Sequence, residues 1–333
     1  ERKRTRSSRA RVAILADEAH RSHGHGTTAA LHSLLCGGSA QPRHVSYVSF
    51  SATPSELALK LFGVQNHQKG RREPFHCYGL REALRDGVCV DVLANYTCAY
   101  PKLTLRDRAG RARPLDEALA HARAGEAGMS GSDRTSALVR RARAARAVMM
   151  RAKAAALRDF VQRTLARAVA EGQDDPKAML VVRSRRDCVE YRAQLLRLHD
   201  EQVAQVGEPG SRESVGHLQL GGGLRILVSF SGALHADGLT EDAEEDAEQA
   251  LSQGDLTERS LNRVGDVVSA FRNPGAALLI VCAKLETGFD EPRVCCLCID
   301  RALHGAHAVQ VLGRANRAAK GKQVHVLDFV NSA

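Results

Sequence analysis

Residues 12–20 read VAILADEAH, a run of five apolar residues followed by Asp17, Glu18, Ala19 and His20. The apolar run has the length and composition of a buried β-strand, so the two acids follow directly at its carboxyl end. Open α/β sheets bind ligands at that edge, because the loops that leave parallel strands meet there. An acidic pair in this place suits nucleotide hydrolysis. Asp17 would hold Mg²⁺ on the phosphates through water, and Glu18 would orient or deprotonate the attacking water.

Six further apolar runs of strand length follow, separated mostly by segments of helix length. This alternation predicts an α/β fold in which helices cover parallel sheets. A chain of 333 residues exceeds the usual size of one compact domain, so we expect two lobes. The six runs are residues 45–50, 178–182, 226–230, 278–282, 294–299 and 324–329.

The expected organisation has three parts. Residues 1–98 would form the first lobe, which would be incomplete, and residues 176–333 the second. Between them, residues 99–175 would form a basic helical bridge, because residues 134–171 are rich in Ala and Arg and almost free of Gly and Pro. The arginines of this bridge would contact phosphates or simply be solvated. An acidic surface insertion is expected near residues 233–256.

The formal net charge of +10 favours an anionic partner, of which a phosphate backbone is the commonest, although a solvated basic surface gives the same value. No apolar run approaches the roughly 20 residues that span a bilayer. The first residues, ERKR, lack the apolar core of a secretory signal. We therefore expect an intracellular, cytoplasmic protein without a membrane partner.

The nine cysteines are an odd count for a disulfide framework and lie mostly in apolar segments. Cys295 and Cys298 have the spacing of half a zinc site, but no second pair lies nearby in the sequence. Residues 294–299, VCCLCI, read better as a buried strand than as a metal site.

Two segments near the end of the chain carry further chemistry. Residues 285–292 read LETGFDEP and follow the strand at 278–282. Gly288 would allow a tight backbone approach, and Thr287 would meet a DNA backbone. Asp290 would accept hydrogen bonds from the nucleotide sugar or from the arginines of the facing segment.

That facing segment is residues 310–317, QVLGRANR. Gln310, Arg314 and Arg317 are spaced at i, i+4 and i+7, so a helix would present all three on one face, where they would close on ATP. Arginine offers a planar, permanently charged fork for the γ-phosphate. The alternative is an ordinary basic helix with incidental spacing.

These segments resemble, in order, the motifs of superfamily 2 helicases, and most of all the R subunit of type I restriction enzymes. Residues 14–24, ILADEAHRSHG, resemble the Walker B segment of that family, in which a DEAH box is followed by Arg-Ser. Residues 46–54, SYVSFSATP, resemble the helicase Ser/Thr-Ala-Thr motif, with Ser51 and Thr53 at the hydroxyl positions that connect nucleotide state to the DNA path. LETGFDEP resembles motif V, and QVLGRANR has every specified residue of the helicase pattern Gln-x-x-Gly-Arg-x-x-Arg.

The resemblance implies two RecA-like lobes that use ATP and Mg²⁺. Glu18, Arg314 and Arg317 would be catalytic, and Asp17, His20, Gly288, Asp290 and Gln310 would bind nucleotide. The implied activity is ATP-driven translocation along double-stranded DNA, in a complex with methylation and specificity subunits that cleaves DNA.

The sequence contains no Walker A loop, Gly-x-x-x-x-Gly-Lys-Ser/Thr, which grips the phosphates in such motors. In the family, this loop and the nuclease domain precede the DEAH box. We therefore expect the chain to be an N-terminally truncated fragment that neither turns over ATP nor cuts DNA alone. Two alternatives stay open: another superfamily 2 helicase, and a degenerate, non-catalytic nucleic-acid-binding protein.

Overall fold

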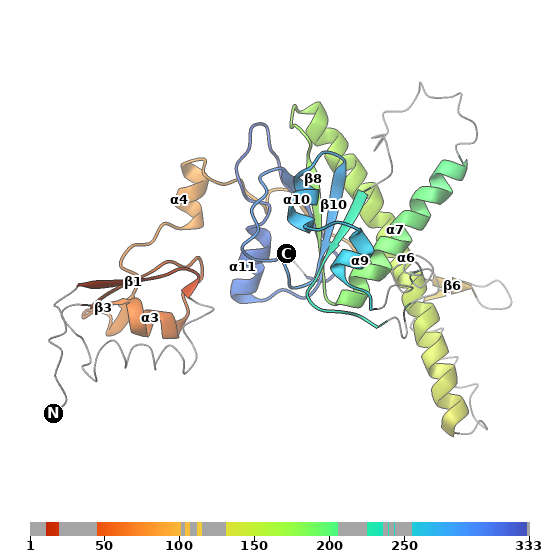
Figure 1. The fold of residues 1–333 in the computed structure, drawn as a ribbon, viewed down its shortest axis with the longest axis horizontal. Helices are drawn as coiled ribbons and strands as arrows, with labels where there is room; N and C mark the ends of the chain where they lie inside the picture. The colour runs from red at the N-terminus through yellow and green to blue at the C-terminus, as the bar shows by residue number, and fades with distance from the viewer. Residues whose placement is uncertain are drawn as a thin grey trace, which may run out of the picture. The chain divides into compact units, whose positions relative to one another are not determined.

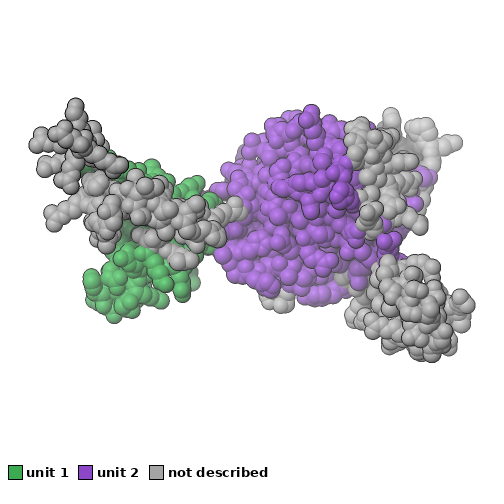
Figure 2. All heavy atoms as spheres, turned by 60° about the horizontal axis from the view of Figure 1, so that its bottom comes forward, with its two compact units in different colours: residues 1–82 green, residues 83–333 purple. Residues whose placement is uncertain are grey.

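The computed structural model describes residues 11–19, 45–100, 104–106, 112–114, 131–205, 225–235, 239, 243 and 255–331, which we call the described chain. The chain divides into two compact units, Glu1–Glu82 (unit 1) and Ala83–Ala333 (unit 2). Figure 2 colours them separately. Each unit is treated by itself below.

Unit 1 contains a two-stranded parallel sheet of β1 (Val12–Ala16) and β2 (Val45–Ser49). Helix α3 (Glu56–Phe62) follows, and the Ser55 side chain caps its first turn by accepting from the backbone N–H of Ala58. The antiparallel strands β3 (Val64–Asn66) and β4 (Arg71–Glu73) come next, and α4 (Leu80–Arg85) runs across the division between the units. A small apolar cluster links β1 to α3.

Unit 2 is built on a six-stranded sheet in the order β5-β12-β11-β8-β10-β9. Every neighbouring pair of strands is parallel, which confirms the expected α/β fold with a parallel sheet. The strands are β5 (Tyr96–Cys98), β8 (Lys177–Val182), β9 (Arg225–Ser229), β10 (Ala276–Val281), β11 (Val294–Asp300) and β12 (His325–Asp328).

Helices cover both faces of this sheet, as Figure 1 shows. Side chains of β8 point alternately to the two faces, so Leu180 packs in one apolar cluster and Val181 in the other. The first cluster includes residues of α6 (Gly131–Ala170) and α7 (Arg185–Gln205), and the second includes residues of α10 (Val267–Arg272) and α11 (Gly305–Leu312). The short helix α9 (Glu258–Asn262) contacts β9. Burial on both faces explains why the central strands are almost wholly apolar.

Helix α6 occupies much of the expected bridge and packs on the six-stranded sheet of unit 2. Its residues Ala154, Leu157 and Leu165 are buried in the first apolar cluster. Arg146 of α6 pairs with Asp187 of α7 at 2.5 Å. Helix α6 therefore covers one face of the six-stranded sheet of unit 2. Its Arg146 binds a carboxylate of the protein. A short antiparallel ladder, β6 (Thr104–Arg106) and β7 (Ala112–Pro114), also lies within the segment expected to be helical.

The boundary between the units differs from the one expected at residue 98. Strand β5 pairs with β12, Val326↔Tyr96 through Asp328↔Cys98, and the division falls between Glu82 and Ala83. A three-residue edge strand has too little apolar pattern to be recognised in a sequence. Pairing with a strand about 230 residues later, a long-range contact that sequence patterns do not predict, places it in unit 2.

The acidic insertion near residues 233–256 lies largely outside the described residues. Its two ends are joined, because Leu234 and Leu256 form an isolated antiparallel bridge and Leu256 is fully buried. No helix of the described chain has the combination of length and apolar character needed to cross a membrane.

Candidate nucleotide and nucleic-acid site

The acidic pair in unit 1 lies at the carboxyl end of β1. Strands β1 and β2 pair in register to their last residues, so the segments that leave them begin at the same edge. Asp17 is exposed, and its Oδ1 accepts the backbone N–H of Glu18 at 2.9 Å. Ser51 and Thr53 follow β2, and the hydroxyl oxygen of Ser51 accepts the backbone N–H of Thr53 at 3.2 Å. Unit 1 thus brings four of the expected residues to one sheet edge, whereas His20 lies outside the described residues.

The loop after β10 carries three expected residues of unit 2. Gly288 has φ 73°, a left-handed conformation that favours glycine, and a Cβ there would meet no atom within 4 Å. The backbone angle, and not a close approach within the chain, therefore accounts for this glycine. Phe289 is buried and its ring centroid lies 6.1 Å from that of Phe271, while Thr287 is half-buried and Asp290 is exposed.

The arginine segment does not form the expected continuous helix. Helix α11 ends before Gly313, so Gln310 is helical, Arg314 lies in a turn and Arg317 forms an isolated antiparallel bridge with Cys89. The prediction that a helix presents Gln310, Arg314 and Arg317 on one face is wrong. After Gly313 the chain tightens, because the backbone N–H groups of Arg314 and Ala315 donate to the carbonyls three residues earlier. Arg317 then leaves the helical path and pairs with Cys89.

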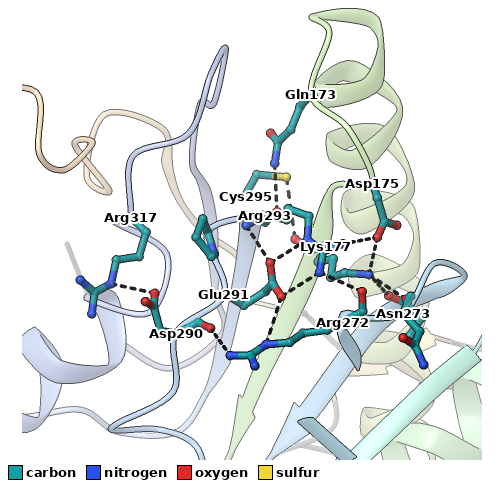
Figure 3. Close-up of polar contacts among 12 residues, drawn as sticks. Gln173, Asp175, Lys177, Arg272, Asn273, Asp290, Glu291, Arg293, Cys295 and Arg317 are labelled. Atoms are coloured by element: carbon teal, nitrogen blue, oxygen red, sulfur yellow. Dashed lines mark hydrogen bonds and ion pairs between the residues drawn. The ribbon is translucent and has the colours of Figure 1, made fainter. Parts of the chain in front are cut away.

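The loop and the arginine segment nevertheless meet. Nε of Arg317 lies 3.1 Å from Oδ1 of Asp290, and both side chains are about half-exposed. Arg314 donates from Nε to the carbonyl of Gln310 at 3.1 Å and from Nη1 to the carbonyl of Phe289. Figure 3 shows the Asp290–Arg317 pair beside the buried contacts described next. Asp17 and Glu18 belong to unit 1 and these arginines to unit 2.

An ionic network that sequence patterns did not reveal holds the residues after Asp290 (Figure 3). Glu291 is 4% exposed, and its Oε1 accepts from Nε of Arg293 at 2.7 Å. Arg293 also pairs with Asp175 at 2.6 Å, and Arg272 donates to the backbone carbonyl of Asp290 at 3.0 Å. Burial raises the pKa of Glu291, but hydrogen bonds and charge from Arg293 outweigh burial and the net pKa is lowered.

Lys177, at the start of β8, is the fully buried cation of this network. Its Nζ donates to the backbone carbonyls of Asn273 at 3.3 Å and Ala276 at 3.0 Å, and pairs with Asp175 at 2.9 Å. It also lies 5.2 Å from the centroid of the Phe271 ring. Because Phe271 packs on Phe289, this buried charge lies beneath the loop that carries Asp290.

Lys322 connects the same loop to the arginine segment. Its Nζ donates to the backbone carbonyls of Pro292 and Arg317, at 2.8 Å each, and the residue is 7% exposed. Burial lowers the pKa of Lys322 from 10.5 to about 8. The backbone of Arg317 is therefore held to the loop by a side chain that gives up its proton more readily than usual.

Lys322→Met should remove one pH dependence of stability. In the wild type, the free energy of unfolding should rise as the pH increases from about 8 toward 10.5, because the unfolded chain still binds a proton that folded Lys322 has lost. The rise should reach roughly 3 kcal/mol at most. Chemical denaturation across this pH range measures it. The exposed Lys320→Met is the control and should keep the wild-type slope, whereas an unchanged slope in Lys322→Met would contradict the assignment.

The cysteine-rich segment is a core strand. Cys295, Cys296 and Cys298 lie in β11 and are fully buried, as the strand interpretation predicted. Burial raises the pKa of the Cys295 thiol to about 12. Within the described chain, no three His, Cys, Asp or Glu side chains are grouped so that they could hold a metal ion.

Comparisons with known proteins add the following. Residues 175–329 match the model of a family described as type I restriction enzyme subunit R domain 3. No curated protein matches the chain. Solved structures similar to the chain at low identity include the three that follow. The ATP-dependent Type ISP restriction-modification enzyme LlaBIII bound to DNA is 14% identical, with a TM-score of 0.44 over 95% of this chain and 18% of that one.

S. cerevisiae Dbp5 bound to RNA and ADP BeF3 is 13% identical, with a TM-score of 0.38 over 96% of this chain and 54% of that one. Mss116p bound to ssRNA and AMP-PNP is 12% identical, with a TM-score of 0.44 over 96% of this chain and 43% of that one. The chain thus spans between about a fifth and about half of the length of these proteins. Likenesses this low assign no activity to the chain.

Proposed function

We propose, from the match of residues 175–329 to the model of the family described as type I restriction enzyme subunit R domain 3, that the chain is part of an ATP-driven motor that moves along double-stranded DNA. In this proposal, the acids of unit 1 act on Mg²⁺ and the attacking water, and the arginines of unit 2 act on the phosphates. The motor acts with methylation and specificity subunits, and cleavage of the DNA follows its movement.

The contact between Asp290 and Arg317 is the observation that supports this function most directly. It brings the motif V-like loop and the arginine segment of the family-matched unit together. The pair is half-exposed, so breaking it costs little, less than about 1 kcal/mol. Arg317 can therefore exchange the carboxylate of Asp290 for the γ-phosphate of ATP and stabilise the charge that develops during phosphoryl transfer. Arg314, which donates to two backbone carbonyls, holds the loop in place.

The edge of unit 1 fits Mg²⁺ and an attacking water. Asp17, Glu18, Ser51 and Thr53 offer only oxygen donors, which Mg²⁺ prefers, and Asp17 is exposed enough to hold the ion through water. When bound, the ion neutralises phosphate charge. Glu18 orients the water and accepts its proton, and the hydroxyls of Ser51 and Thr53 connect the nucleotide state to the DNA path. Since the sequence has no Walker A loop, the 333-residue chain alone should not turn over ATP.

The chain should bind duplex DNA in a strongly salt-dependent way. Thr287 would contact the backbone, and cations of unit 2 would neutralise phosphates, so the affinity should fall at least about tenfold between about 50 mM and about 200 mM salt. Fluorescence anisotropy with a labelled duplex measures this. Thr287→Val should weaken binding about threefold without changing the salt slope, because it removes no charge. Salt-insensitive binding, or none at low salt, would count against the proposal.

A further inference from the structure

Glu286 is a buried carboxylate in the loop between β10 and Asp290, and the proposed chemistry does not use it. The residue is 2% exposed. Its Oε1 accepts from the backbone N–H of Ala283 and from Nη1 of Arg301 at 2.7 Å. Its Oε2 lies 2.8 Å from Nε2 of His307, within hydrogen-bond distance. One side chain thus joins the loop, the segment after β11 and helix α11.

The loop depends on this carboxylate for its shape. Ala283 has φ 60° and Leu285 has φ 64°, left-handed conformations that are unfavourable for residues with a Cβ. Such conformations persist only where surrounding contacts impose them. The hydrogen bond from Ala283 to Glu286 is one such contact, and its acceptor Glu286 directly precedes Thr287. A change at Glu286 would therefore alter the presentation of Thr287.

The same carboxylate reaches the helix that carries Gln310. His307 and Gln310 are three residues apart in α11 and so lie on neighbouring positions of one helix face. A second contact joins the far end of the loop to the segment after α11, where Arg314 donates hydrogen bonds to the backbone carbonyls of Phe289 and Gln310. Polar contacts therefore join the loop to α11 and the segment after it at two places. The contact at Glu286 is the buried one of the two.

We propose that Glu286 is a positioning residue that couples the loop at 283–290 to helix α11, so that a conformational change in one of these segments alters the other. This inference rests on the proposed function. Contact of Thr287 with a DNA backbone would then be transmitted through Glu286 and His307 to Gln310 and to the arginine segment. If Glu286 only stabilised the fold, its substitution would lower the stability of the whole of unit 2. It would not affect the loop at 283–290 and α11 more than other segments.

Hydrogen exchange on the whole chain tests the inference, with exchange followed at 283–290 and 305–312. His307→Ala removes the contact from α11 and leaves Glu286 with its other two donors. Glu286→Gln removes the charge at nearly constant volume. The matched control is Glu190→Gln in α7, because Glu190 is also fully buried and accepts from an arginine, Nε of Arg146 at 2.8 Å.

Without DNA, His307→Ala should speed exchange about tenfold at 283–290 as well as in α11, and Glu286→Gln should do the same, whereas Glu190→Gln should change neither segment selectively. With duplex DNA, both segments of the wild type should become protected, but in His307→Ala protection should stop at the loop. Acceleration confined to α11 in His307→Ala would overturn the inference, even if DNA binding holds. Absence of any protection by DNA in the wild type would instead count against the proposed function, and the DNA-free comparison would still decide the role of Glu286.

Discussion

Arg293→Ala is expected to lower the free energy of unfolding of unit 2 by about 3 kcal/mol, because it leaves the buried charge of Glu291 without its closest partner. Arg293 gives Glu291 its shortest hydrogen bond, 2.7 Å, and Glu291 is 4% exposed. The exposed pair between Arg151 and Glu201 is the matched control, since both side chains are at least 40% exposed. Arg151→Ala should cost less than about 1 kcal/mol.

The loss of stability in acid should be weaker in the same variant than in the wild type. In the wild type, the pKa of Glu291 is lowered, so its contribution to stability is present above the unfolded pKa of 4.5 and is lost as the pH falls through the folded value. In Arg293→Ala, the side-chain hydrogen bonds and the charge of Arg293 are lost, while the backbone N–H of residue 293 and Lys177 still oppose the effect of burial on the pKa, so acid should remove less stability at this residue. Chemical denaturation of the wild type and of Arg293→Ala, from about pH 6 down to about pH 3, measures the two pH dependences of stability. A variant that loses stability with acid as steeply as the wild type would contradict this account of Glu291.

Arg317→Ala should reduce ATP turnover about 1,000-fold in the protein encoded by the whole open reading frame that contains this sequence. The reason is the loss of the charge proposed to meet the γ-phosphate. Stability should hardly change, because Arg317 is 49% exposed and its pair with Asp290 lies at the surface. Arg317→Lys should recover only part of the turnover, since an ammonium lacks the planar fork of arginine.

The control for Arg317 is Arg85→Ala, in which the lost side chain is 74% exposed and pairs with the adjacent Asp86. It should turn over ATP at the wild-type rate. Steady-state ATP hydrolysis at saturating duplex DNA, combined with thermal unfolding of each variant, separates catalysis from folding. Turnover within about twofold of the wild type in Arg317→Ala would remove this residue from the proposed site.

The strands of the second sheet were predictable because burial on both faces leaves a strong apolar signal. The runs at 178–182, 278–282 and 294–299 correspond to β8, β10 and β11 with ends that shift by at most two residues. Strand β5 was not predictable, because its three residues acquire their place only by pairing with β12. The packing of α6 on the sheet was not predictable either, because it depends on contacts with α7 and the sheet that composition does not reveal.

The candidate site was predictable as a set of segments but not as a geometry. Motif-like spacing marked Asp290 and Arg317, and these side chains are in contact. The helical spacing of Gln310, Arg314 and Arg317 was misleading, because α11 ends before Gly313. Glu286 and Lys322 carried no signal of their buried contacts, since a charged residue in a polar loop is usually solvated.

Displacement of a third strand from duplex DNA tests the motor assignment most directly. The protein from the whole open reading frame is given ATP and a duplex that carries a triplex-forming oligonucleotide at a distance from the site of binding. If the chain belongs to a double-stranded DNA translocase, the oligonucleotide should be released only with ATP, and Glu18→Gln should abolish release while duplex binding persists. Duplex-stimulated ATP hydrolysis without release, or release by Glu18→Gln at the wild-type rate, would contradict the assignment.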